Sequence, residues 1–97
     1  MRMILAAAAS ALLFTVPAAH AATIMPDLVG KGLDTAYAQF SQDTKITTID
    51  ATGAGRIVLM PSNWKVCAHD PRAGAFLFPG AIVTFVVVKN EEKCASA

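Results

Sequence analysis

An apolar run near the C-terminus, AIVTFVVVK at residues 81–89, restricts the possible folds more than any other part of this sequence. Its β-branched residues favour an extended strand, in which successive side chains point to opposite faces of a sheet. One face then carries Val83, Phe85 and Val87, and the other is also apolar, interrupted only by Thr84. We therefore expect a sheet that packs on a helix through the first face and has a second apolar face that needs cover.

Two arrangements would cover this second face. The favoured one uses the segment RIVLM, residues 56–60, as a further strand that is stopped by Pro61 and folds back over the face. The alternative is an interface there with a partner protein or with a second copy of the chain.

The first 21 residues have the composition of a secretory signal peptide. A basic start at Arg2 and an apolar run lead to the small-x-small triplet AHA that ends at Ala21. The apolar run is shorter than the roughly 20 residues that a membrane span needs, so a retained membrane anchor is the less favoured alternative. We expect cleavage after Ala21 and a soluble exported protein that is associated with the cell wall or secreted.

Removal of residues 1–21 leaves 76 residues, which is enough for one small domain, residues 22–97, with its core within residues 24–89. Seven Lys or Arg residues then balance seven Asp or Glu residues. Binding to nucleic acid or to an anionic membrane requires clustered positive charge, so we expect neither.

The two cysteines, Cys67 and Cys94, form an even pair in an exported chain, and we expect a disulfide between them. Closing that loop is worth roughly 3.5 kcal/mol of chain entropy, and it would fasten the tail NEEKCASA to the strand that contains Cys67. A zinc site needs four ligands, whereas the mature chain offers two cysteines and one histidine without ligand spacing. We therefore expect no metal and no cofactor.

The mature sequence predicts one helix followed by strands. Leu33, Ala36, Tyr37 and Phe40 recur at the spacing of one helix face, which indicates an amphipathic helix of two to three turns. The expected strands cover residues 45–50, 56–60, 63–70 and 81–89. In the third of these, Trp64, Val66 and Ala68 should share one face. This order predicts an α+β fold with a short N-terminal helix on a three- to four-stranded, largely antiparallel sheet.

Two stretches carry a resemblance to a known family. MPDLVGKGLDTA at residues 25–36 and VCAHDPRAGAFLFPGAIVTFVVVK at residues 66–89 resemble the opening and the closing half of a PASTA domain. The family commonly has Ser or Thr where this chain has Gly32, and its connection corresponding to residues 52–64 is shorter. The NWKVC segment with a C-terminal cysteine is most similar to small exported single-domain proteins of actinobacteria.

PASTA domains occur mostly as repeats outside the membrane on bacterial serine/threonine kinases and penicillin-binding proteins. The resemblance implies a non-enzymatic module at the cell wall that recognises peptidoglycan fragments or muropeptides, or β-lactam-like mimics of them, or that serves as a spacer. The alternative function is a protein-interaction or inhibitor-like module that binds another exported or envelope protein.

Three residues are candidates for ligand binding, and each has a second interpretation. Trp64 is either a core residue or a stacking platform, whereas Arg56 and Lys65 either pair with a carboxylate of a stem peptide or are solvated charges. His69 and Asp70 are adjacent on a predicted strand, so they point to opposite faces and cannot form an acid–base pair. We expect a surface histidine there, no catalytic residue and no enzyme.

Overall fold

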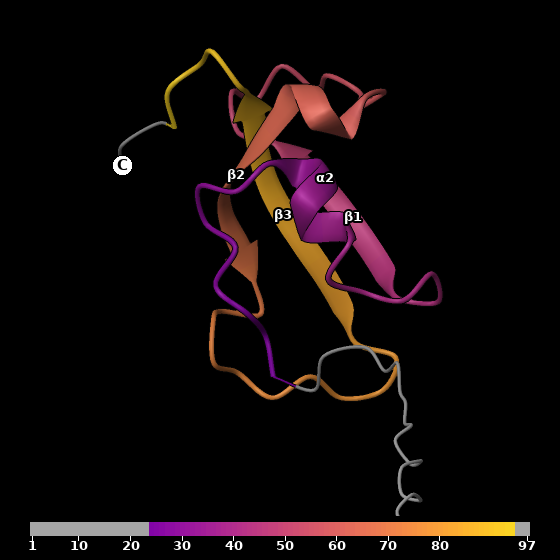
Figure 1. Ribbon diagram of the computed structural model, residues 1–97. Coiled ribbons are helices and arrows are strands. Elements are labelled where there is room, and N and C mark those ends of the chain that lie inside the picture. The colour runs from indigo at the N-terminus through magenta and orange to yellow at the C-terminus, as the bar shows by residue number, and fades with distance from the viewer. Residues whose placement is uncertain (1–23, 95–97) are drawn as a thin grey trace, which may run out of the picture.

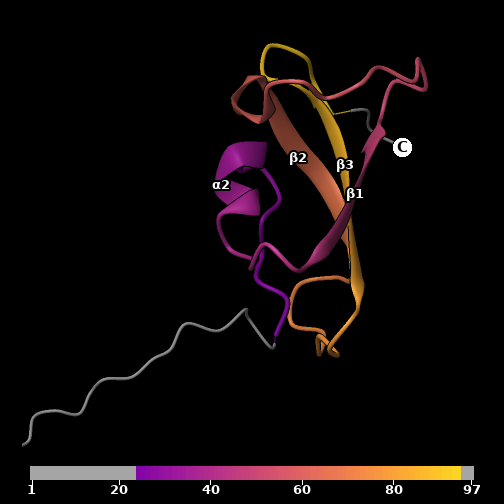
Figure 2. The same cartoon turned by 90° about the vertical axis from the view of Figure 1, so that its right-hand side faces the viewer.

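The computed structural model describes residues 24–94, so the predicted signal peptide at residues 1–21 lies outside the described part. The elements, in chain order, are α2 (Leu33–Tyr37), β1 (Lys45–Asp50), the 3-10 turn η2 (Pro61–Asn63), β2 (Trp64–Asp70) and β3 (Ile82–Lys89). The three strands form one sheet in the order β1-β3-β2, with α2 against one face (Figures 1 and 2). The α+β prediction and the positions of β1, β2 and β3 are confirmed.

The sheet is mixed rather than largely antiparallel. β3 pairs antiparallel with β2 and parallel with β1. The chain reverses direction after β1 and again after β2, so β1 and β3 run the same way. Because β3 is the most apolar strand, it takes the central position, and this places it beside β1.

The helix α2 has only five residues, fewer than the two to three turns that were predicted. Gly32 at its N-terminus offers no capping side chain, and beyond Tyr37 the backbone bonds shorten from i−4 to i−3 spacing, as from the Phe40 N–H to the Tyr37 carbonyl at 3.1 Å. The predicted stripe is nevertheless correct. Leu33 and Ala36 are fully buried, and Tyr37 and Phe40 pack against the same core.

The core lies between α2 and the sheet. Buried apolar side chains from the lead-in, the helix and the strands build it: Met25, Leu28, Leu33, Ala36, Trp64, Val66, Val83, Phe85 and Val87. The rings of Tyr37, Phe40 and His69 each lie 6.2 Å from the ring of Phe85, centroid to centroid. Phe85 is therefore the centre around which the helix and β2 are assembled.

Residues 56–60 do not cover the opposite face of β3, contrary to the favoured prediction. The segment forms no strand, and its one inward residue, Val58, packs against the core on the helix side. On the uncovered face, Ile49 is 50% exposed and Ile82 is 56% exposed. Only Val88 is buried there, at the end of β3 where the C-terminal tail turns back.

A bulge in β2 breaks the predicted alternation. The pairing register with β3 shifts between Val66 and Ala68, so Cys67 is the extra residue. Val66 stays buried, Ala68 turns out to solvent, and His69 comes to lie opposite Phe85. The bulge thereby moves His69 onto the core face.

His69 is accordingly a half-buried structural residue and not a surface histidine. Its Nε2 accepts the Leu28 backbone N–H at 3.2 Å, and its Nδ1 lies 2.7 Å from the Pro71 carbonyl oxygen. Because Nε2 accepts, Nδ1 carries the proton and donates to Pro71. The side chain thus ties the lead-in to the end of β2.

The predicted disulfide between Cys67 and Cys94 is confirmed, with a Cα–Cα distance of 5.5 Å. It joins the bulge in β2 to the C-terminal tail, 27 residues further along the chain. The tail is therefore tied covalently to a strand of the sheet.

Candidate binding site

Asp50, the last residue of β1, organises the loop that follows. Its side chain is 1% exposed, and its carboxylate accepts the backbone N–H groups of Thr52 and Arg56, both at 3.0 Å. It also accepts the Thr52 hydroxyl at 2.8 Å. These bonds fold residues 50–56 into a tight loop in which Gly53 and Gly55 have positive φ.

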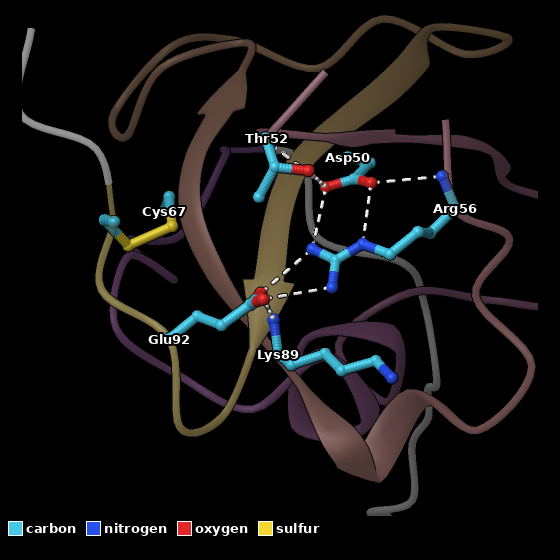
Figure 3. Close-up of a disulfide and its surroundings, with 7 residues drawn as sticks. Asp50, Thr52, Arg56, Cys67, Lys89 and Glu92 are labelled. Carbon is cyan, nitrogen blue, oxygen red and sulfur yellow. Dashed lines mark hydrogen bonds and ion pairs between the residues drawn. A yellow bond between two sulfur atoms is a disulfide. The ribbon is translucent and has the colours of Figure 1, made fainter. Parts of the chain in front are cut away.

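Arg56 connects this loop to the C-terminal tail (Figure 3). Its Nε donates to Asp50 at 2.8 Å, and its Nη1 and Nη2 donate to Glu92 at 3.0 and 2.9 Å. Nη2 donates to Asp50 as well, so four of the five side-chain N–H groups of a guanidinium are engaged. We refer to Asp50, Arg56 and Glu92 as the Arg56 clamp.

The clamp leaves Arg56 at most one side-chain N–H for a ligand. A bidentate contact with a stem-peptide carboxylate needs two parallel N–H groups. The geometry therefore gives Arg56 a structural role, in which it fixes residues 51–60 against the tail.

The guanidinium of Arg56 holds the pKa of the Asp50 carboxyl well below its ordinary value of 3.8, and it also lowers the pKa of Glu92 below 4.5. A carboxyl whose pKa is lower in the folded state stabilises the fold above its ordinary pKa. That contribution is lost progressively as the pH falls below the ordinary values. The clamp is thus an acid-sensitive element.

We predict that the free energy of unfolding falls more steeply between about pH 5 and pH 2 in the wild type than in an Arg56→Met variant. The variant lacks the cation that lowers the pKa values of Asp50 and Glu92. Protonation of these two carboxylates at low pH should therefore cost the variant less stability. Arg72→Met, which removes an exposed cation from another loop, is the matched control and should keep the wild-type slope. Denaturant titrations at a series of pH values measure the slopes, and equal slopes for the wild type and Arg56→Met would contradict the role of the clamp.

Trp64 lies beneath two cations. It is 3% exposed, with the Arg56 Cζ 5.0 Å and the Lys89 Nζ 5.8 Å from its ring centroid. A cation at this distance is attracted by the face of the ring. Trp64 is therefore a core residue covered by charge and not an open stacking platform.

Lys65 lies on the opposite face of β2 from Trp64. It pairs with Val88 in the ladder and is half-buried. The structure brings Arg56 and Trp64 together but does not bring Lys65 to them, because adjacent residues of a strand point to opposite faces.

The exposed part of this region is an apolar ridge formed by Ile57, Leu59 and Met60, which are 76%, 81% and 59% exposed. Beside the ridge is a pocket of about 230 Å³ lined by Ile57, Leu59, Met60, Asn63, Trp64 and Lys89. Within residues 24–94, the backbone groups of residues 57–59 have no hydrogen-bond partner. Residues 56–60, predicted as a strand, are thus an irregular segment with a bend at Leu59, and within residues 24–94 no strand pairs with it.

Sequence reasoning found Arg56 and Trp64 but missed the ridge, Asp50 and Glu92. The pattern D-A-T after a predicted strand is a signal for an Asx turn at Asp50, since aspartate bonds its own backbone two residues on. No local pattern indicates the pairing of Arg56 with Glu92, which lies 36 residues away.

Two further classes of site have no counterpart in the described part of the chain. Among residues 24–94, no three His, Cys, Asp or Glu side chains gather as ligands for a metal ion. None of the helices in that part is both long and apolar enough to span a membrane.

Comparison with known proteins gives no match to a family, to a curated protein or to a solved structure.

Proposed function

We propose that this protein is an exported, non-enzymatic binding module that takes up an extended apolar segment of another envelope protein along residues 56–60. The observation that supports it is the apolar ridge, with Ile57 and Leu59 largely exposed on a segment whose backbone has no partner within residues 24–94. A partner strand added there would gain main-chain hydrogen bonds and cover both side chains. The resemblance to PASTA domains, with their binding roles outside the membrane, supports the same class of function.

The ridge is held in place before a partner arrives. Val58 is anchored in the core between the two exposed residues, and the Arg56 clamp fixes the start of the segment. Little conformational entropy would then be lost on binding, which favours affinity. Burial of Ile57 and Leu59 against the partner would each contribute about 1.5–3 kcal/mol to the free energy of binding.

The size of the pocket favours a protein segment over a muropeptide. Sites for small molecules usually enclose about 300–1,000 Å³, and this pocket has about 230 Å³. It suits a single anchoring side chain next to the ridge. Trp64 is also too buried to stack on a sugar, and Arg56 is engaged in the clamp.

Export is part of the proposal. The signal-peptide pattern at residues 1–21 supports it, as does the disulfide between Cys67 and Cys94, because disulfides persist in oxidising compartments outside the cytoplasm. The matching partner is then a protein of the envelope or of the medium.

Photo-cross-linking in the producing bacterium tests the proposal. A photoreactive residue at Leu59 should give a discrete adduct with one envelope protein, whereas the same residue at the exposed Gln39 should not. The double substitution Ile57→Ser and Met60→Ser, made in the Leu59-labelled protein, should reduce the adduct about tenfold or more, because burial of each side chain is lost.

Purified peptidoglycan sacculi provide the competing test. Retention of the wild type on sacculi, unchanged by the two serine substitutions and accompanied by no adduct at Leu59, would contradict the proposal and favour recognition of peptidoglycan.

A further inference from the structure

A second group of exposed apolar side chains lies at the other end of the sheet, in the loop between β2 and β3. Phe76 is 56% exposed and Phe78 is 66% exposed. Their rings pack edge to face, with 4.8 Å between the ring centroids. Ile24, bridged to Phe76, and Ile82 at the start of β3 are 50% and 56% exposed. We refer to these four residues as the apolar pole.

The phenylalanines are exposed because the loop is anchored between them. Leu77 packs against the core, and successive residues of an extended segment point in opposite directions. The base of the loop is bonded to the lead-in, where the Met25 N–H donates to the Ala75 carbonyl at 2.8 Å and the Gly74 N–H to the Met25 carbonyl at 2.7 Å. Folding therefore fixes Phe76 and Phe78 outward.

We propose that the apolar pole inserts into the surface of a lipid bilayer. The loop at residues 71–81 contains Arg72 and no carboxylate, so its insertion would bury no acidic group. Two acids lie near this end of the sheet but outside the loop: Asp70, opposite Thr84, and the exposed Asp43, two residues before Lys45, which pairs with Ile82. Phenylalanine and isoleucine side chains can enter the boundary between headgroups and acyl chains, where burial of apolar area drives binding.

The path of the chain also favours a bilayer as the occupant. Ile24, which bridges to Phe76, follows directly on residues 1–23, whose sequence contains the apolar run of the predicted leader. Before the expected cleavage after Ala21, a signal peptide in the membrane would hold Ile24 within three residues of the cleavage site. The near-neutral charge of the mature sequence further indicates that apolar insertion, and not attraction to anionic lipid, drives the contact.

The pole and the ridge lie at opposite ends of the sheet (Figure 1). β3 runs between them from Ile82 to Lys89, which is roughly 23 Å at 3.3 Å per residue. A module bound to the bilayer through the pole would therefore hold the ridge away from the surface and open to a partner. The inference extends the proposed function and does not depend on the identity of the partner.

Vesicle flotation tests the inference. The protein is purified from the extracytoplasmic fraction of an expressing bacterium, its N-terminus is established by mass spectrometry, and it is mixed with vesicles of phosphatidylethanolamine and phosphatidylglycerol. We expect flotation that changes little with salt. Each phenylalanine should raise the affinity for vesicles about tenfold. The double substitution Phe76→Ser with Phe78→Ser should therefore weaken vesicle binding about a hundredfold. The matched control, Ile57→Ser with Leu59→Ser at the ridge, should bind as the wild type does.

A second measurement uses a Phe78→Trp variant. Brominated lipid should quench the emission of the new tryptophan and leave that of Trp64 in the wild type unchanged, because Trp64 is 3% exposed and lies at the other end of β3. Absence of flotation by the wild type would overturn the inference. Equal losses of vesicle binding in the pole variant and the ridge variant would overturn it as well. Self-association that depends on Phe78, in the absence of vesicle binding, would also overturn it. Cross-linking from Leu59 reports on the proposed function separately.

Discussion

Replacing Phe85 with alanine is expected to lower the free energy of unfolding by about 3–5 kcal/mol, as large-to-small substitutions of buried aromatic residues do. Phe85 is fully buried at the centre of β3 and contacts three rings, two from the end of the helix and one from β2. His69 is held in the sheet, and its ring is bonded to the Leu28 N–H and the Pro71 carbonyl, so the cavity cannot close completely. In a domain of this size, the loss is a large share of a typical total stability of about 5–15 kcal/mol.

The matched control for this prediction is Phe78→Ala, which removes the same side chain from a site that is 66% exposed. This substitution should change the free energy of unfolding by no more than about 0.5 kcal/mol, as other surface substitutions do. Urea denaturation followed by circular dichroism measures both variants. Equal losses would show that the core is not centred on Phe85.

Removing the disulfide by Cys67→Ser with Cys94→Ser is expected to lower the free energy of unfolding by roughly 3.5 kcal/mol, from the chain entropy regained by the unfolded state. There is a local consequence as well. Glu92 lies two residues before Cys94, so release of the tail frees the carboxylate that holds one side of Arg56. Exchange of the hydrogen-bonded amides in residues 51–56 should therefore accelerate more than exchange in β3.

The substitution Glu92→Gln separates the two effects, since it weakens the clamp while the disulfide stays intact. It should accelerate exchange of the bonded amides in residues 51–56, with a smaller loss of global stability than the double serine variant shows. If the two variants lose equal stability in denaturant titrations, the contribution of the tail lies in Glu92 and the chain-entropy account is wrong.

The parts of this fold that depend on local pattern were predictable. The stripe of Leu33 and Ala36, the alternation of Val83 and Phe85, and the paired cysteines each carry their signal within a few residues or within the composition. Those signals were sufficient for the helix, the three strands and the disulfide.

The errors concern features set by distant contacts. Residues 56–60 have the β-branched and aliphatic composition of a strand, but a strand also needs a partner, and none lies beside this segment within residues 24–94. The bulge at Cys67 reverses the faces of Ala68 and His69 through its pairing with β3, which composition does not show. The parallel pairing of β1 with β3 follows from the order of strands in space and not from any one strand.

The candidate site was predictable only in part, for the same reason. Arg56 and Trp64 were recognised by residue type alone, Arg56 as a cation and Trp64 as an aromatic side chain. The role of Arg56 is determined by Asp50 and by Glu92, the latter 36 residues away. Lys65 was a candidate because its charge could pair with a carboxylate of a stem peptide, although the pleat of β2 places it on the other face.

Amide hydrogen exchange at Ile57 and Leu59 tests the central proposal most directly, because it reports whether their backbone is free to pair with a partner strand. In the isolated protein both amides should exchange far faster than the amide of Val86 in β3. In the complex with the protein captured from Leu59, both should become protected. Protection already present in the isolated protein, or rapid exchange that persists in the complex, would contradict strand addition at residues 56–60.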